Sequence, residues 1–160
     1  MPPVPMNAVI RSIGVGQVVS SRRDDMRPGD VVAGFVGWQD YCLADDALLE
    51  APLTVLPTPL PAPVNAFAGL LGHTAVSAYL GVEFLDPQPG QTVVVSAAGG
   101  GVGSLAGQLA KLRGARVVGI AGGKDKCRHV VETLGFDVCV DHRDPQWREA
   151  LDAGTPDGID

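Results

Sequence analysis

The chain has 160 residues, of which 46% are hydrophobic and 19% charged, and this composition is typical of a globular protein that buries a core. Domains usually run to roughly 100–200 residues, so the length fits one domain, or one domain with part of another, but not two complete ones. A net charge of −6 with three lysines argues against a nucleic-acid-binding surface.

The three cysteines, Cys42, Cys127 and Cys139, are widely spaced and form no CxxC pair. They therefore predict small core residues rather than disulfides or zinc ligands, and we expect no bound metal and a cytoplasmic location. The first residues lack the pattern of a signal peptide, and no apolar run approaches the ~18 residues of a membrane-spanning helix. We expect no membrane partner.

The first third of the chain is predicted to be β-structure. Short runs rich in β-branched or aromatic residues occupy 15–21, 30–36 and 38–44, and turn-forming residues separate them, which is typical of a barrel or sandwich. Residues 53–63 contain four prolines, which prevent a helix or a central strand. We expect that segment to connect two regions.

The remainder alternates between helical and extended patterns. Residues 64–80 have helical spacing, with a predicted buried stripe of Phe67, Leu70, Leu71, Ala75, Ala78 and Tyr79. Strands are predicted at 92–96, 116–121 and 137–141, with helices at 102–113 and 124–134 and a further helix opened by Asp144 and Pro145 that ends near Gly154. This order predicts an α/β fold, a partial Rossmann-type doubly wound parallel sheet.

The strongest motif is SAAGGGVGS (96–104), between a predicted strand and a predicted helix. Aligned with GxGxxG, it places Ala98, Gly100 and Gly103 where a tight turn, a close approach to a pyrophosphate and close helix–strand packing are needed. Backbone N–H groups near Val102 would face the diphosphate at the start of the helix. The alternative is an ordinary strand-to-helix turn.

The end of the second predicted strand favours NADP over NAD. NAD enzymes place an acid there for the ribose hydroxyls, whereas this chain has Gly122 and Gly123, which leave space, followed by Lys124 and Lys126. Cations and space suit an adenosine 2′-phosphate, although Asp125 counts against this. An S-adenosylmethionine methyltransferase would also want the acid, so its absence disfavours that alternative.

Residues 96–144 resemble the zinc-independent medium-chain dehydrogenase/reductases, specifically the prostaglandin reductase, alkenal double-bond reductase and curcumin reductase group. The upstream pieces GQVVSSR (16–22), GDVV (29–32) and GWQDY (37–41) resemble the β-barrel domain of the same group. The resemblance implies a remnant of a GroES-like β-barrel over residues 1–58 and a partial NADP-binding Rossmann domain over 59–160. We expect this chain to be an incomplete version of such a protein.

The resemblance further implies an NADPH-dependent reductase of the C=C bond of α,β-unsaturated ketones or aldehydes. Lys126 would meet the 2′-phosphate, His142 would approach it from the end of the third strand, and Ser77 would stand near the nicotinamide in place of a threonine. A small enone or quinone would be the substrate, and a homodimer is possible. Two alternatives stay open: a quinone reductase, and a dinucleotide-binding module without catalytic activity.

Overall fold

A computed structural model describes residues 3–45 and 51–160, and the chain divides into two compact units, residues 1–72 and 73–160. The domain boundary predicted between residues 58 and 59 stays a prediction. No helix within the described ranges combines the length and the apolar character that crossing a bilayer requires.

The first unit contains a three-stranded antiparallel sheet in the order β1-β2-β3. Its elements are β1 (Ile13–Gln17), β2 (Val31–Phe35), β3 (Thr54–Val55) and a short 3-10 helix, η1 (Val64–Ala68). Strands β1 and β2 pair from Ile13 opposite Phe35 to Gln17 opposite Val31. The two strands expected around 15–21 and 30–36 are therefore confirmed, the first beginning two residues earlier than predicted.

The third predicted strand, at 38–44, is wrong: those residues form bends and loop. Gly37 adopts a left-handed φ of 71°, and the N–H of Trp38 bonds to the carbonyl of Ile10, which turns the chain away from the sheet. Trp38 and Tyr41 are 78% and 81% exposed, so their aromatic rings do not form the buried face of a strand.

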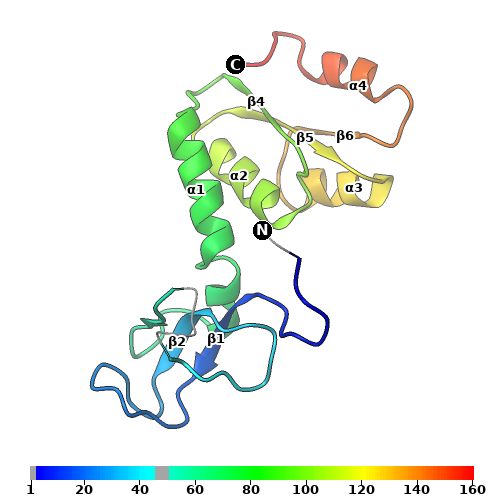
Figure 1. Cartoon of the computed structure of the whole chain (residues 1–160). Coiled ribbons are helices and arrows are strands. Elements are labelled where there is room, and N and C mark those ends of the chain that lie inside the picture. Colours follow the sequence, from blue (N-terminus) through cyan, green and yellow to red (C-terminus); the bar gives the residue numbers. More distant parts are fainter. Residues whose placement is uncertain (1–2, 46–50) are drawn as a thin grey trace. The chain divides into compact units, whose positions relative to one another are not determined.

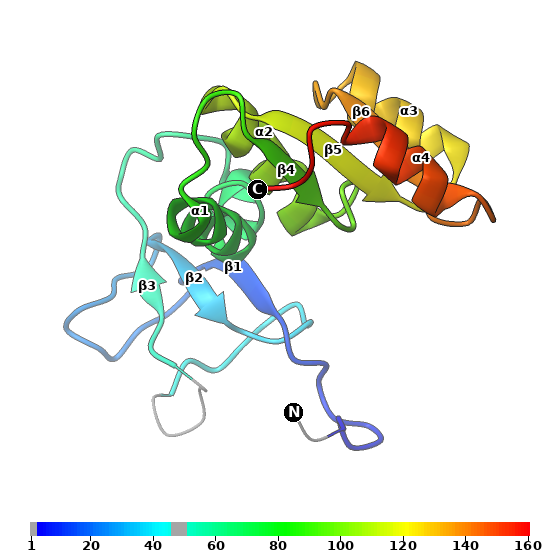
Figure 2. The ribbon, with the colours of Figure 1, turned by 90° about the horizontal axis from the view of Figure 1, so that it is seen from above.

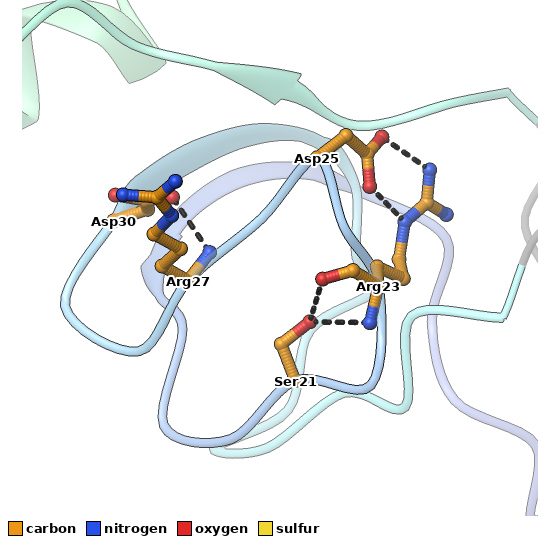
Figure 3. A network of polar contacts seen from close by, with 5 residues as sticks. All are labelled: Ser21, Arg23, Asp25, Arg27 and Asp30. Carbon is orange, nitrogen blue, oxygen red and sulfur yellow. Dashed lines mark hydrogen bonds and ion pairs between the residues drawn. The ribbon is translucent and has the colours of Figure 1, made fainter.

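The loop between β1 and β2 is held by local polar contacts (Figure 3). The guanidinium of Arg23 donates two hydrogen bonds to the carboxylate of Asp25, at 2.8 and 2.7 Å. The N–H of Arg23 bonds to Oγ of Ser21 at 2.9 Å, and the N–H of Arg27 bonds to Oδ2 of Asp30 at 2.8 Å. The last two of these bonds satisfy backbone N–H groups in a loop outside the sheet.

The second unit confirms the predicted alternation of helices and strands (Figure 1). Its parallel sheet has the order β4-β5-β6. The elements are α1 (His73–Leu85), β4 (Thr92–Val95), α2 (Gly101–Leu112), β5 (Arg116–Ala121), α3 (Lys124–Glu132), β6 (Val138–Asp141) and α4 (Trp147–Gly154). The last helix begins three residues after Asp144, whose carboxylate accepts the N–H of Gln146.

Helices cover both faces of this sheet, so it is doubly wound: α2 and α3 pack on one side and α4 on the other (Figures 1 and 2). Val117 and Val118 are both fully buried because neighbouring side chains of a strand point to opposite faces. The main core lies on the side of α2 and α3, and its buried members are Val93, Ala98, Ala110, Ala115, Val117, Val130 and Phe136.

The helix predicted at 64–80 needs correction. Residues 64–80 are not one helix but η1, a turn and the start of α1, and of the predicted stripe only Ala78 is fully buried, while Leu70, Leu71 and Tyr79 are half exposed. In α2 the buried residues are Gly103, Gly107 and Ala110. Small residues lie against the sheet here because the helix and the strands approach closely. The larger residues of α2 are partly or fully exposed.

The chain returns to the free edge of β4 at residue 160. The N–H of Asp160 bonds to the carbonyl of Thr92 at 3.1 Å, and the N–H of Thr92 bonds to the Asp160 carboxylate at 2.8 Å. Since β5 occupies the other edge of β4, this contact places residue 160 where the next strand of a doubly wound sheet lies.

Candidate functional site

Three turns meet at one edge of the parallel sheet, where β4, β5 and β6 end (Figure 1). They comprise residues 96–100, 122–123 and 142–143. Ligands of open α/β sheets bind outside the carboxyl ends of the strands, because the turns there are free of the helices that cover the faces. All the predicted cofactor-binding residues except Ser77 lie in these turns or in the first turn of the helix that follows.

The turn after β4 is tight and tied to β5. Ala97 adopts a left-handed φ of 49°, and its carbonyl accepts the N–H of Gly100 at 2.8 Å. The N–H of Ala98 bonds to the carbonyl of Ile120 at 3.0 Å, and Ala98 is fully buried. A small residue is therefore required at the first position of the motif.

The third position of the motif admits only glycine. A Cβ on Gly103 would lie 2.4 Å from the carbonyl oxygen of Ala97, whereas one on Gly100 would lie 3.1 Å from it. Gly100 caps α2 in an extended conformation without a side-chain hydrogen bond, and Val102 in the first turn is half exposed. The N–H groups of this turn have no intrahelical acceptor, which suits them to an anion.

The turn after β5 is anchored by Asp141 at the end of β6. Oδ1 of Asp141 accepts the N–H of Gly123 at 2.8 Å and the N–H of Arg143 at 3.0 Å. These two hydrogen bonds lower the pKa of Asp141 below its ordinary value, and the bond from Gly123 has the larger effect. Gly123 has a left-handed φ of 100°, which favours glycine there.

The space above Gly122 is occupied, not empty. A Cβ on Gly122 would lie 2.8 Å from Nε2 of His142 and 3.2 Å from Nε of Arg143. A Cβ on Gly123 would lie 3.6 Å from a terminal nitrogen of Arg143. The two glycines therefore make room for the side chains of residues 142 and 143, which the sequence pattern did not indicate.

Lys126 adds a third basic side chain near these turns. Its side-chain stem lies beside the turn after β4, since a Cβ on Gly99 would be 3.8 Å from both Cβ and Cδ of Lys126. Asp125, which counted against an NADP site, forms an ion pair with Arg128 on the same helix. His142 and Arg143 thus lie over Gly122, whereas Lys126 lies beside Gly99, and all three side chains are exposed.

Ser77 lies apart from these turns, on α1. Its hydroxyl donates to the carbonyl of His73 at 3.0 Å, within its own helix. Helix α1 packs along α2, and Cγ2 of Thr74 would lie 3.0 Å from a Cβ on Gly101. It is therefore Thr74, one turn before Ser77, that lies over the start of α2.

Two residues of the site were not predicted, Asp141 and Arg143. The signal for them is the segment DHRD (141–144), which places an acid and two potential cations at the end of the third strand. Uncapped N–H groups and a cationic turn at one sheet edge fit a dinucleotide with a further phosphate on its ribose. No cluster of three or more His, Cys, Asp or Glu side chains placed to hold a metal occurs in residues 3–45 and 51–160.

Comparison with known proteins agrees with this arrangement. Residues 1–51 match the family described as N-terminal domain of oxidoreductase, and residues 101–160 match that of zinc-binding dehydrogenase. The chain is 42% identical to the NADPH-dependent curcumin reductase of Escherichia coli and 37% identical to the NADP(+)-dependent 2-alkenal reductase of Nicotiana tabacum. The matches include 99% and 94% of this chain but 45% and 43% of those proteins.

The fold leads to the same proteins. The crystal structure of CurA from Vibrio vulnificus in complex with NADPH matches all of this chain with a TM-score of 0.88 and 36% identity, and the matched part is 46% of that protein. The chain thus spans about 45% of the length of the Escherichia coli curcumin reductase. The chain is thus similar, over more than nine tenths of its length, to curcumin, alkenal and prostaglandin reductases.

Proposed function

We propose that this chain carries the NADPH-binding site of a reductase that acts on the C=C bond of α,β-unsaturated ketones or aldehydes. The observation that supports it best is the placement of His142 and Arg143 over Gly122, at the end of the second strand, with the exposed Lys126 nearby on α3, its stem beside Gly99. NAD-specific sites have a carboxylate at that strand end. A basic side chain in its place favours a 2′-phosphate.

Each part of the proposed site has a separate task. The turn from Ala98 to Gly103 holds the diphosphate through backbone N–H groups at the start of α2, and Lys126 and His142 hold the 2′-phosphate. Ser77, on α1, would stand near the nicotinamide. When bound, NADPH would supply a hydride for the β-carbon of the substrate, and the reduction would also require one proton.

The proposal extends from the site to the whole protein through the relatives named above. Curcumin reductase and 2-alkenal reductase are named for conjugated carbonyl compounds, so a small enone or enal is the proposed substrate class. The proposed organisation is a GroES-like barrel domain over 1–58 and a Rossmann domain over 59–160, in a cytoplasmic protein able to form a homodimer.

Calorimetric titration of the 160-residue chain with NADPH and with NADH tests the proposed cofactor preference. We expect tighter binding of NADPH, and Lys126→Ala should weaken it about tenfold while leaving NADH within about twofold, because a charged hydrogen bond contributes roughly 1.5–3 kcal/mol and exposure reduces it. Arg128→Ala is the matched control, since Arg128 is also exposed on α3 and is paired with Asp125. Equal affinity of the unaltered chain for both cofactors would refute the proposal.

Turnover separates the candidate activities. NADPH oxidation is followed with a small enone, with a quinone and without substrate, at saturating cofactor. Faster oxidation with the enone supports the proposed reductase, and faster oxidation with the quinone supports a quinone reductase instead. Specific NADPH binding without oxidation in either case would identify the chain as a binding module.

A further inference from the structure

We propose that Arg143 is a specificity residue for the 2′-phosphate of NADPH, held in place by Asp141. The inference rests on the proposed function, and it adds a second strong cation to the site from a different strand. Lys126 extends from α3 beside Gly99 in the turn after β4, whereas Arg143 extends over the Gly122–Gly123 turn from the end of β6.

The position of the guanidinium carries the proposal. Nε of Arg143 lies 3.2 Å from the point where a Cβ would stand on Gly122, and a terminal nitrogen lies 3.6 Å from the corresponding point on Gly123. The side chain therefore lies along the turn that ends β5, which is where dinucleotide-binding sheets receive the adenosine ribose. A guanidinium there presents a planar pair of donors that matches two phosphate oxygens.

Arg143 also differs from the cations that have structural partners. Lys111, Arg113 and Arg128 each form an ion pair with a carboxylate. Within 3–45 and 51–160, by contrast, no carboxylate oxygen lies within ion-pair distance of the Arg143 guanidinium. The guanidinium of Arg143 thus forms no ion pair with these residues, and its side chain lies over the glycine turn.

Asp141 positions this arginine through the backbone. One carboxylate oxygen receives the N–H groups of both Gly123 and Arg143, so the turn after β5 and the start of the loop after β6 share an anchor. The register of the sheet makes this possible, because Asp141 stands opposite Ala121, the last residue of β5. Backbone N–H donors engage the carboxylate and lower its pKa, and the charge of Arg143 lowers that pKa further without a direct ion pair.

Binding measurements on the full 160-residue chain test this assignment with NADPH, NADH, 2′,5′-ADP and 5′-AMP as probes. Arg143→Ala should raise the Kd for NADPH and for 2′,5′-ADP about tenfold, with NADH and 5′-AMP changed less than about twofold, because only the first pair carries the 2′-phosphate. Arg143→Lys should recover part of the affinity. Arg128→Ala is the control, since Arg128 is an exposed arginine of α3 already paired with Asp125.

The outcomes separate the two proposals. If the unaltered chain does not prefer NADPH, the proposed function fails, and this assignment fails with it. If the unaltered chain prefers NADPH and Lys126→Ala abolishes the preference while Arg143→Ala retains it, the role of Arg143 alone is overturned. Equal weakening of all four probes by Arg143→Ala, with an unchanged circular dichroism spectrum, would also overturn it, because it would show a general effect on the loop.

Discussion

Replacing Gly107 by alanine should destabilise the second unit even though alanine is the better helix former. Gly107 lies on the buried face of α2, where a Cβ would come within 1.8 Å of Cζ of Phe136 and within 2.5 Å of both Cε atoms. The ring cannot move outward freely, because Phe136 is 2% exposed and packs in the main core beside Val130 and Gly119.

The expected magnitude follows from two opposing contributions. Alanine gains about 1 kcal/mol over glycine in a helix interior. Overpacking a well-filled core costs about 1–3 kcal/mol, and a contact this short belongs at the upper end or beyond. The free energy of unfolding should therefore fall by about 2 kcal/mol. Gly81→Ala in α1 is the matched control, since nothing lies within 4 Å of a Cβ there, and it should be neutral or raise stability by up to about 1 kcal/mol.

Guanidinium chloride unfolding, followed by the fluorescence of Trp147, reports on this unit. A Trp38→Phe background removes the other tryptophan, which is 78% exposed in the first unit. The same substitution in a Phe136→Leu background should cost about 1 kcal/mol or less, because leucine lacks the ring atoms that Gly107 faces. If Gly107→Ala destabilises both backgrounds equally, the clash with the ring is not the cause and the reasoning is refuted.

Three further predictions concern other parts of the second unit and the cysteines. Burial alone raises the pKa of Asp137, but hydrogen bonds from Lys111 and a backbone N–H outweigh it and hold that pKa below its usual value. The carboxylate therefore stabilises the fold above about pH 4 and ceases to do so as the pH falls through its lowered pKa, so Asp137→Asn should cost about 1–2 kcal/mol at pH 7 and flatten the acid decline in thermal unfolding. Iodoacetamide at pH 8 should label exposed Cys42 well before Cys139, whose pKa burial and a neighbouring thiol raise to about 12, and mass spectrometry showing equal rates would contradict this. Gly103→Ala should weaken NADPH and NADH alike by displacing the turn after β4, and a selective loss of NADPH in calorimetry would argue against that explanation.

The alternation of strands and helices in the second unit was predictable because it rests on local patterns. Residues 92–141 show hydrophobic runs of strand length, helical spacing between them and glycines at the helix ends, and each pattern is complete within a few turns of chain. The buried face of α2 was not predictable in the same way. Hydrophobicity points to its larger residues, whereas the distance between helix and sheet selects Gly103, Gly107 and Ala110.

Features that depend on distant partners escaped prediction. The aromatic segment 38–44 has the composition of a strand but pairs with no strand in residues 3–45 and 51–160, and strand formation requires a partner. Arg143 follows the same logic, since its place above Gly122 arises from the parallel pairing of β5 with β6, 20 residues apart in the chain. Sequence spacing located Lys126 because it lies on the element that directly follows the turn.

The shared oxygen of Asp141 has a consequence for how such a site changes during evolution. Since one atom holds the backbone of both Gly123 and Arg143, a substitution that reshapes one segment also releases the other. A replacement of Asp141 therefore removes both hydrogen bonds at once, whereas a replacement of the Arg143 side chain leaves them in place, because the backbone N–H remains. Divergent relatives should show coordinated replacements at the two strand ends.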